Sequence, residues 1–195
     1  FQVAEGFQRT HDRKKYLLRM LVFALISEIP FNYLYYSSPV FPFHQNVMFT
    51  FFIALLLMLG LEKLRGKGTG VYIIAAALSL PVGYFLGTVT MVDYYGSGVV
   101  TVLIFYLCRQ IPYGWIGEVA GLAFLNCKLL GGMTIPLTLG SWTLEFPEQG
   151  LALLALIPIW LYNGRQGAHN KAIQYACYAF YPAHMLILAL LRMYL

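Results

Sequence analysis

Long apolar stretches alternate with short polar connections along almost the whole chain. A helix needs about 18 apolar residues to cross a bilayer, because it rises about 1.5 Å per residue and the hydrocarbon core is about 30 Å thick. The pattern predicts an all-α, polytopic transmembrane helical bundle that forms one domain over residues 1–195. About seven spanning or half-spanning segments are expected, at residues 16–36, 47–61, 71–89, 98–108, 113–130, 151–162 and 172–195.

Two of these segments are too short to cross a bilayer as straight helices. Residues 98–108 would form about 16 Å of helix and residues 47–61 about 22 Å. A polar stretch precedes each of them, VDYYGSG at 92–98 and HQN at 44–46. Polar groups at membrane depth must face protein or a cavity. We therefore expect the HQN side chains to face the interior and Asp93 to lie at a polar cavity or at the surface.

Basic residues set the predicted orientation in the membrane. If the segments alternate in direction, ten of the thirteen Lys and Arg residues fall on one side, the exceptions being Arg19, Lys128 and Arg192. Basic loops remain in the cytoplasm, so a multi-pass membrane protein with these loops in the cytoplasm is expected; the family resemblance described below implies the bacterial inner membrane. The connections at 37–46 and 131–149 contain no Lys or Arg and are predicted to lie outside.

Composition narrows the classes of partner. The chain is 59% hydrophobic and only 11% charged, with a mean hydropathy of +0.67, which excludes an ordinary soluble domain. The lipid bilayer is the predicted partner. Because the net charge of +5 resides in loops beside apolar segments, no nucleic-acid partner is expected. The spacing of the Cys and His residues fits no metal motif, so no metal is expected, and the three cysteines are interpreted as structural thiols.

Two histidines and one aspartate are candidates for catalysis. His184 lies in the middle of an apolar segment, two residues after Pro182, where the helix loses a backbone hydrogen bond. It is either a general base or a structural histidine. His44 is a second candidate base. Asp93 would fix the tautomer of a histidine or bind a cationic group, unless it is a solvated loop residue.

A further group of polar residues is expected to bind an acceptor or to stabilise the bundle. Asn46 is also a plausible N-cap for the helix that follows it. Glu28 and Glu118, inside apolar segments, need partners, for which Arg19 and Lys128 are available. The candidates for acceptor binding are Gln45, Asn46, Tyr94 and Glu28.

The stretch NGRQG at residues 163–167 combines an arginine with two glycines. Glycines allow the backbone to approach a phosphate, and a guanidinium pairs with it bidentately. A phosphorylated donor is therefore expected to dock at Asn163, Gly164, Arg165 and Gly167; the alternative is a plain basic turn.

The order of several motifs resembles the TraX family of bacterial integral membrane proteins. These motifs are EGF, HDRKKYLLRMLVFALISEIPFN, HQNVMFTFFIALL, DYYGSGVV, YNGRQG and YPAHMLILALLR, and they cover essentially the whole chain. The resemblance implies a membrane acetyltransferase that moves an acetyl group from acetyl-CoA to a pilin-like protein N-terminus or another amine or hydroxyl acceptor. It also implies a further hydrophobic segment before residue 1.

The predicted sides of the candidate residues add one requirement. His44 and Asp93 are expected near the outer face and Arg165 near the inner face. Acyl transfer between them needs a passage through the bundle. The alternatives are a small-molecule transporter, for which a midplane site is expected, and a non-enzymatic membrane component of a conjugation or secretion assembly.

Overall fold

The computed structural model describes residues 1–139, 142–165, 167 and 170–194 of the chain. Four helices are long and apolar enough to cross a membrane, which confirms the prediction of a helical membrane protein. They are α2 (Arg13–Tyr36), α3 (Val47–Arg65), α4 (Thr69–Val89) and α8 (Lys171–Tyr194).

Shorter elements complete the chain. They are α1 (Gln2–Arg9), α5 (Tyr95–Cys108), α6 (Gly114–Phe124) with a π-helical turn (Leu125–Leu129), a 3₁₀ helix (Glu148–Ala155) and α7 (Leu156–Trp160). Two parts of the chain differ clearly from the sequence-based expectation, namely the end of α3 and the connection at residues 131–149. Helix α3 does not end at residue 61, because Glu62 accepts a hydrogen bond from the Tyr106 hydroxyl (2.7 Å) and pairs with Arg13 (3.2 Å). These partners accommodate the polar residues of its last turn.

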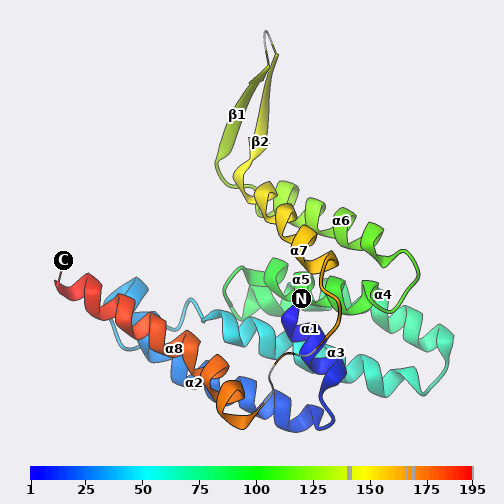
Figure 1. The fold of residues 1–195 in the computed structure, drawn as a ribbon, viewed down its shortest axis with the longest axis horizontal. Helices are drawn as coiled ribbons and strands as arrows, with labels where there is room; N and C mark the ends of the chain where they lie inside the picture. Colours follow the sequence, from blue (N-terminus) through cyan, green and yellow to red (C-terminus); the bar gives the residue numbers. More distant parts are fainter. Residues whose placement is uncertain (140–141, 166, 168–169, 195) are drawn as a thin grey trace.

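The connection at 131–149 is the other difference. It contains an antiparallel hairpin of β1 (Thr134–Leu139) and β2 (Trp142–Pro147), in which Thr134 pairs with Pro147. The hairpin projects away from the helices (Figure 1). In the sequence of β1 the apolar residues Ile135, Leu137 and Leu139 occupy every second position, which is the period of a strand.

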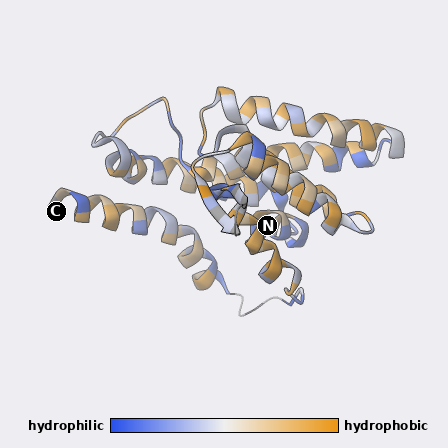
Figure 2. Cartoon of the chain, turned by 90° about the horizontal axis from the view of Figure 1, so that it is seen from above, coloured by the Kyte–Doolittle hydropathy of each residue, from blue (hydrophilic) through white to orange (hydrophobic). Residues whose placement is uncertain are grey.

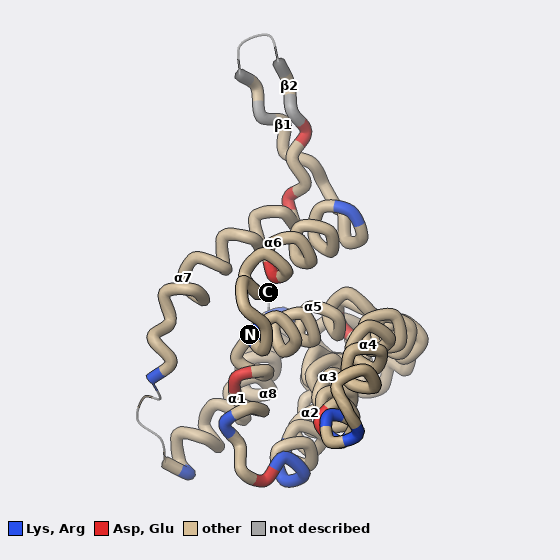
Figure 3. Tube along the Cα trace, turned by 90° about the vertical axis from the view of Figure 1, so that its right-hand side faces the viewer, with Lys and Arg blue, Asp and Glu red and all other residues tan. Residues whose placement is uncertain are grey.

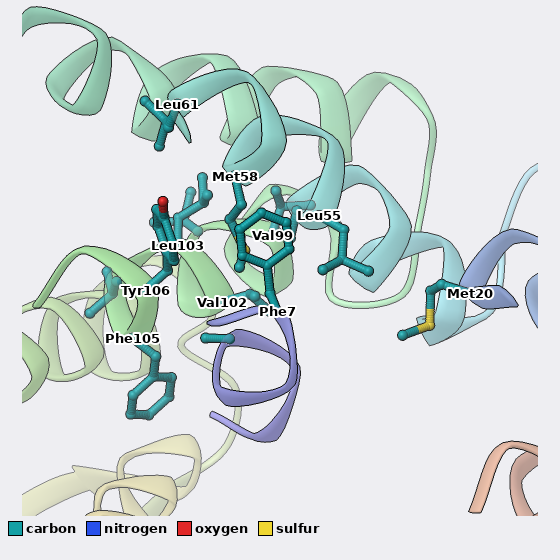
Figure 4. Packing of buried hydrophobic residues seen from close by; sticks show 14 of the residues in the cluster. Phe7, Met20, Leu55, Met58, Leu61, Val99, Val102, Leu103, Phe105 and Tyr106 are labelled. Atoms are coloured by element: carbon teal, nitrogen blue, oxygen red, sulfur yellow. The ribbon is translucent and has the colours of Figure 1, made fainter. Parts of the chain in front are cut away.

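Helix α5 lies at the centre of the bundle, in contact with α1, α3, α4 and α6. Its residues Val99, Leu103 and Tyr106 are fully buried. Phe7 of α1 packs against Tyr106 edge to face, at 5.8 Å between ring centroids, near Met58 of α3 (Figure 4). The short helix is therefore enclosed by protein and not by lipid, and its 14 residues do not need to span a bilayer.

Close packing of α4 against α5 positions the Asp93 connection between them. A Cβ atom at Gly96 would lie 2.2 Å from the Tyr84 carbonyl oxygen, so only glycine fits there. Helices α2 and α8 run side by side and parallel, with Phe23 stacked on Tyr178 at 5.0 Å (Figure 1).

The outer surfaces of the long helices are apolar (Figure 2). Large hydrophobic side chains such as Leu25, Phe85 and Phe180 are 58 to 68% exposed. Exposed apolar surface on this scale is typical of contact with lipid. The basic connections α1–α2, α3–α4 and α7–α8 lie toward the same end of the molecule (Figure 3).

Candidate functional site

Two connections that are far apart in the sequence form the first part of the site. The Gln45 backbone N–H donates to the Met91 carbonyl, and the Asp93 N–H donates to the Gln45 carbonyl, both at 2.9 Å. This short parallel bridge joins the start of α3 to the α4–α5 connection. As a result, His44 Nε2 lies 3.7 Å from Asp93 Oδ1.

His44 is held from several directions. Its Nδ1 atom lies 2.6 Å from the Tyr36 hydroxyl, while its ring stacks on Tyr95 and meets the edge of Phe31. A hydroxyl that donates to Nδ1 leaves the proton on Nε2, directed at Asp93. Tyr36, His44 and Asp93 thus form a row of polar side chains in which a carboxylate next to Nε2 favours that tautomer. We call the three side chains, together with Asn46 and Glu28, the histidine–aspartate cluster.

Asn46 connects this cluster to the bundle. It caps α3 by accepting from the Met48 N–H at 3.0 Å, and its amide donates to Glu28 Oε2 at 2.6 Å and to the Ala24 carbonyl at 2.9 Å. The N-cap expectation is thereby confirmed. The suggested pairing of Glu28 with Arg19 was wrong, since nine helical residues separate them by about 13 Å.

The other intrahelical glutamate also has a partner that was not expected. Glu118 accepts a hydrogen bond from the Trp160 indole at 2.7 Å rather than pairing with Lys128. The structural role foreseen for these glutamates therefore holds, with neutral donors in place of cations.

Asp93 is partly buried, and burial raises the pKa of its carboxyl above the ordinary value of 3.8, with His44 opposing this shift. His44 and Asp93 retain 24% and 29% side-chain exposure, so both are accessible to a small reactant. Asp93, Thr50 and Tyr94 line a cavity of about 310 Å³ that continues toward α7. Tyr94 adopts a left-handed conformation (φ 58°) at the start of α5, and the Thr50 hydroxyl donates to the Asp93 carbonyl.

His184 lies apart from this arrangement in its described contacts. Its Nδ1 is 3.0 Å from the Phe180 carbonyl, and its ring packs on Phe180 and Tyr181, all within α8. Tyr181, also in α8, has a buried hydroxyl without a hydrogen-bond partner among the described residues. Sequence reasoning missed Tyr181 and Tyr36 because tyrosines were attributed to packing and to membrane interfaces.

The NGRQG loop lies beside α1, because its Gly164 contacts Arg9. The Asn163 side chain accepts from the Arg165 N–H at 2.9 Å, and the Gly164 carbonyl accepts from Arg9 at 2.6 Å. Gly164 has a positive φ of 72°, whereas a side chain at Gly167 would meet nothing within 4 Å. The Arg165 side chain is exposed. The loop thus contacts Arg9 of α1 through Gly164, whereas the side chain of Arg165 faces outward.

A larger hollow, of about 1010 Å³, lies beside this loop, between α1, α7 and the first turns of α2 and α8. We call it the arginine cleft, after Arg9 and Arg19, which line it. Arg9 Nε lies 2.6 Å from Glu5 Oε1, and Arg109 Nη2 lies 2.8 Å from Glu5 Oε2. The sequence analysis attributed Arg9 and Arg109 to topology alone, and it offered Arg19 as a partner for a glutamate inside an apolar segment.

The arginine cleft and the Asp93 cavity adjoin each other. Phe1, Ala155 and Ile159 line both of them. The two hollows therefore meet at these three residues, with Arg9 and Arg19 in the lining of one and Asp93 and Thr50 in the lining of the other.

The fold and these cavities define a helical membrane protein that contains the histidine–aspartate cluster and, separately, the arginine cleft. The model of the family described as TraX protein matches residues 1–192, and the chain belongs to this family. It is also similar to the probable fimbrial assembly protein FimC, serogroup H1, of Dichelobacter nodosus. The two are 27% identical over 209 residues, covering 100% of this chain and 78% of the relative. No solved structure matches the chain.

Proposed function

We propose that this protein is a multi-pass, inner-membrane acetyltransferase that moves an acetyl group from acetyl-CoA to an amine or hydroxyl acceptor, such as a pilin-like N-terminus. The observation that carries the proposal is that the arginine cleft and the Asp93 cavity adjoin, with Phe1, Ala155 and Ile159 in both linings. The basic loops support a cytoplasmic position for the cleft, on the side where acetyl-CoA is found.

His44 is the proposed base. It takes a proton from the acceptor through the Tyr36 hydroxyl, which lies 2.6 Å from Nδ1, while Asp93 stabilises the resulting imidazolium. The acceptor nitrogen or oxygen attacks the thioester carbonyl, the C–S bond breaks, and the coenzyme A thiolate leaves and is protonated. His44 is preferred to His184 because it has partners that orient both ring nitrogens.

A non-enzymatic role is the second candidate. The name of the Dichelobacter nodosus relative refers to fimbrial assembly, and a component of an assembly can act by contact alone. Such a protein needs no passage between the cluster and the cleft. Transport of a small molecule, the third possibility, predicts uptake that does not consume acetyl-CoA.

The test uses purified protein in lipid nanodiscs with radiolabelled acetyl-CoA and peptides that carry free N-termini. His44→Gln is expected to lower acetyl transfer at least about 100-fold, the usual contribution of a general base. His184→Gln is the matched variant, and it identifies the alternative base if it causes the larger loss. Absence of acceptor-dependent acetyl transfer in the wild type would refute the proposal, and uptake into vesicles would then distinguish the transporter from the assembly component.

A further inference from the structure

Arg19 is a cation without an anion. It lies six residues into α2, about 9 Å along the helix from Arg13, and lines the arginine cleft. Its Nε atom is buried without a hydrogen-bond partner among the described residues. Within the same part of the chain no Asp or Glu oxygen pairs with it; its neighbours are the Tyr16 and Tyr178 phenols. Charged groups at this depth are normally paired, because leaving water is costly.

The other charged residues in and around the cleft do not neutralise Arg19. Glu5 is shared between Arg9 and Arg109, so that one carboxylate faces two guanidiniums. Asp12 is engaged elsewhere, since it caps α2 and pairs with Lys15 at 3.2 Å. After these pairings an excess of arginine charge remains around the hollow, and an anionic ligand would balance it.

The residues that line the cleft indicate the shape and polarity of the rest of such a ligand. The lining includes the polar residues Gln2 and Gln174, whereas the side shared with the Asp93 cavity is formed by Phe1, Ala155 and Ile159. A suitable ligand therefore has a charged head and a slender, less polar extension. A guanidinium binds phosphate oxygens through two parallel N–H groups.

We propose that the arginine cleft is a phosphate-ester site in which Arg19 is the principal anchor and Arg9 the second. The chain attached to the phosphate extends past Phe1 and Ile159 toward Asp93. This inference rests on the proposed function where the ligand is acetyl-CoA, and it assigns the phosphates to Arg19 and Arg9 instead of to the exposed Arg165. A phospholipid headgroup has the same chemistry and is the other source of such a ligand.

Binding of coenzyme A, which cannot transfer an acetyl group, tests the site separately from catalysis. Calorimetry on detergent-purified protein should show that Arg19→Met weakens binding by about 10- to 100-fold, as expected for charge-assisted hydrogen bonds. Arg19→Lys should recover part of the affinity, because it restores the charge without the bidentate geometry. Lys67→Met is the matched control, since Lys67 is an exposed lysine at the same end of the molecule. Pantetheine, which has no phosphate, should bind wild type and Arg19→Met equally.

The outcomes separate the site from the proposed function. If coenzyme A does not bind but short-chain phosphatidic acid does, and Arg19→Met weakens it, the phosphate site stands and the acyl-donor assignment fails. The site is overturned if Arg19→Met leaves the binding of both ligands unchanged, or if Arg165→Met weakens binding as strongly. Equal elution profiles and thermal unfolding would show that Arg19→Met is folded.

Discussion

The histidine–aspartate cluster and the arginine cleft handle buried polar groups in opposite ways. In the cluster, His44, Asn46 and Glu28 have partners supplied by the chain itself. In the cleft, Arg19 has no carboxylate partner among the described residues, and the hollow measures about 1010 Å³. The first region therefore satisfies its polar groups from within the chain, whereas the second contains an unpaired cation.

This difference affects what each region contributes to stability. A satisfied network fixes the positions of the elements that it joins, and losing one member leaves the others buried without partners. A cation with no partner contributes desolvation cost and little else. Substitutions in the two regions should therefore change the free energy of unfolding with opposite signs.

Asn46→Ala should have the largest effect. It removes the α3 cap and leaves Glu28 and the Ala24 carbonyl without their donor, so we expect a loss of about 3 kcal/mol in the free energy of unfolding. Denaturant titration in mixed micelles measures the change. Asn163→Ala, which removes a similar cap from an exposed loop, should cost less than about 1 kcal/mol. Equal losses in the two variants would show that the cluster does not stabilise the α2–α3 contact.

The helical architecture was accessible from the sequence because apolar runs report burial and lipid contact directly. The hydrogen-bond partners of the polar residues could not be predicted from the sequence in this way. Glu28 was assigned a cationic partner, yet its partner depends on which face of α3 meets α2, and this is decided by the Gln45–Val92 bridge between distant connections. Hydropathy contains no information on such a bridge.

The cleft was missed for a related reason. Arg9 lies in a basic patch that the positive-inside rule explains fully, and nothing in the sequence distinguishes an arginine that faces a hollow from one that faces water. The apolar residues Ile135, Leu137 and Leu139 at every second position of β1 were the available signal for the hairpin. The segment was predicted instead as a connection between two membrane segments.

Arg19→Met provides the contrasting result at the cleft. Removing an unpaired, partly buried cation while keeping most of the side-chain volume should leave the free energy of unfolding unchanged or increase it by about 1 kcal/mol. The same titration measures it, in protein freed of lipid and nucleotide. A loss comparable to that of Asn46→Ala would mean that Arg19 is a structural member of the bundle and not a ligand-binding residue.

Asp93→Asn should have the smallest effect, visible as a change in pH dependence. Burial raises the folded-state pKa of Asp93 above 3.8, so the folded protein retains this proton at pH values where the unfolded chain has lost it. The contribution of Asp93 to stability is therefore greatest in acid and decreases as the pH rises from 3.8 through the raised pKa. Thermal unfolding from about pH 4 to about pH 7 should show this decrease in the wild type and not in Asp93→Asn. His44, Tyr36 and Tyr95 lie beside this carboxyl and are present in both proteins. A decrease that persists in Asp93→Asn would show that another group titrates. The pKa of the Asp93 carboxyl in the histidine–aspartate cluster would then not be raised by burial.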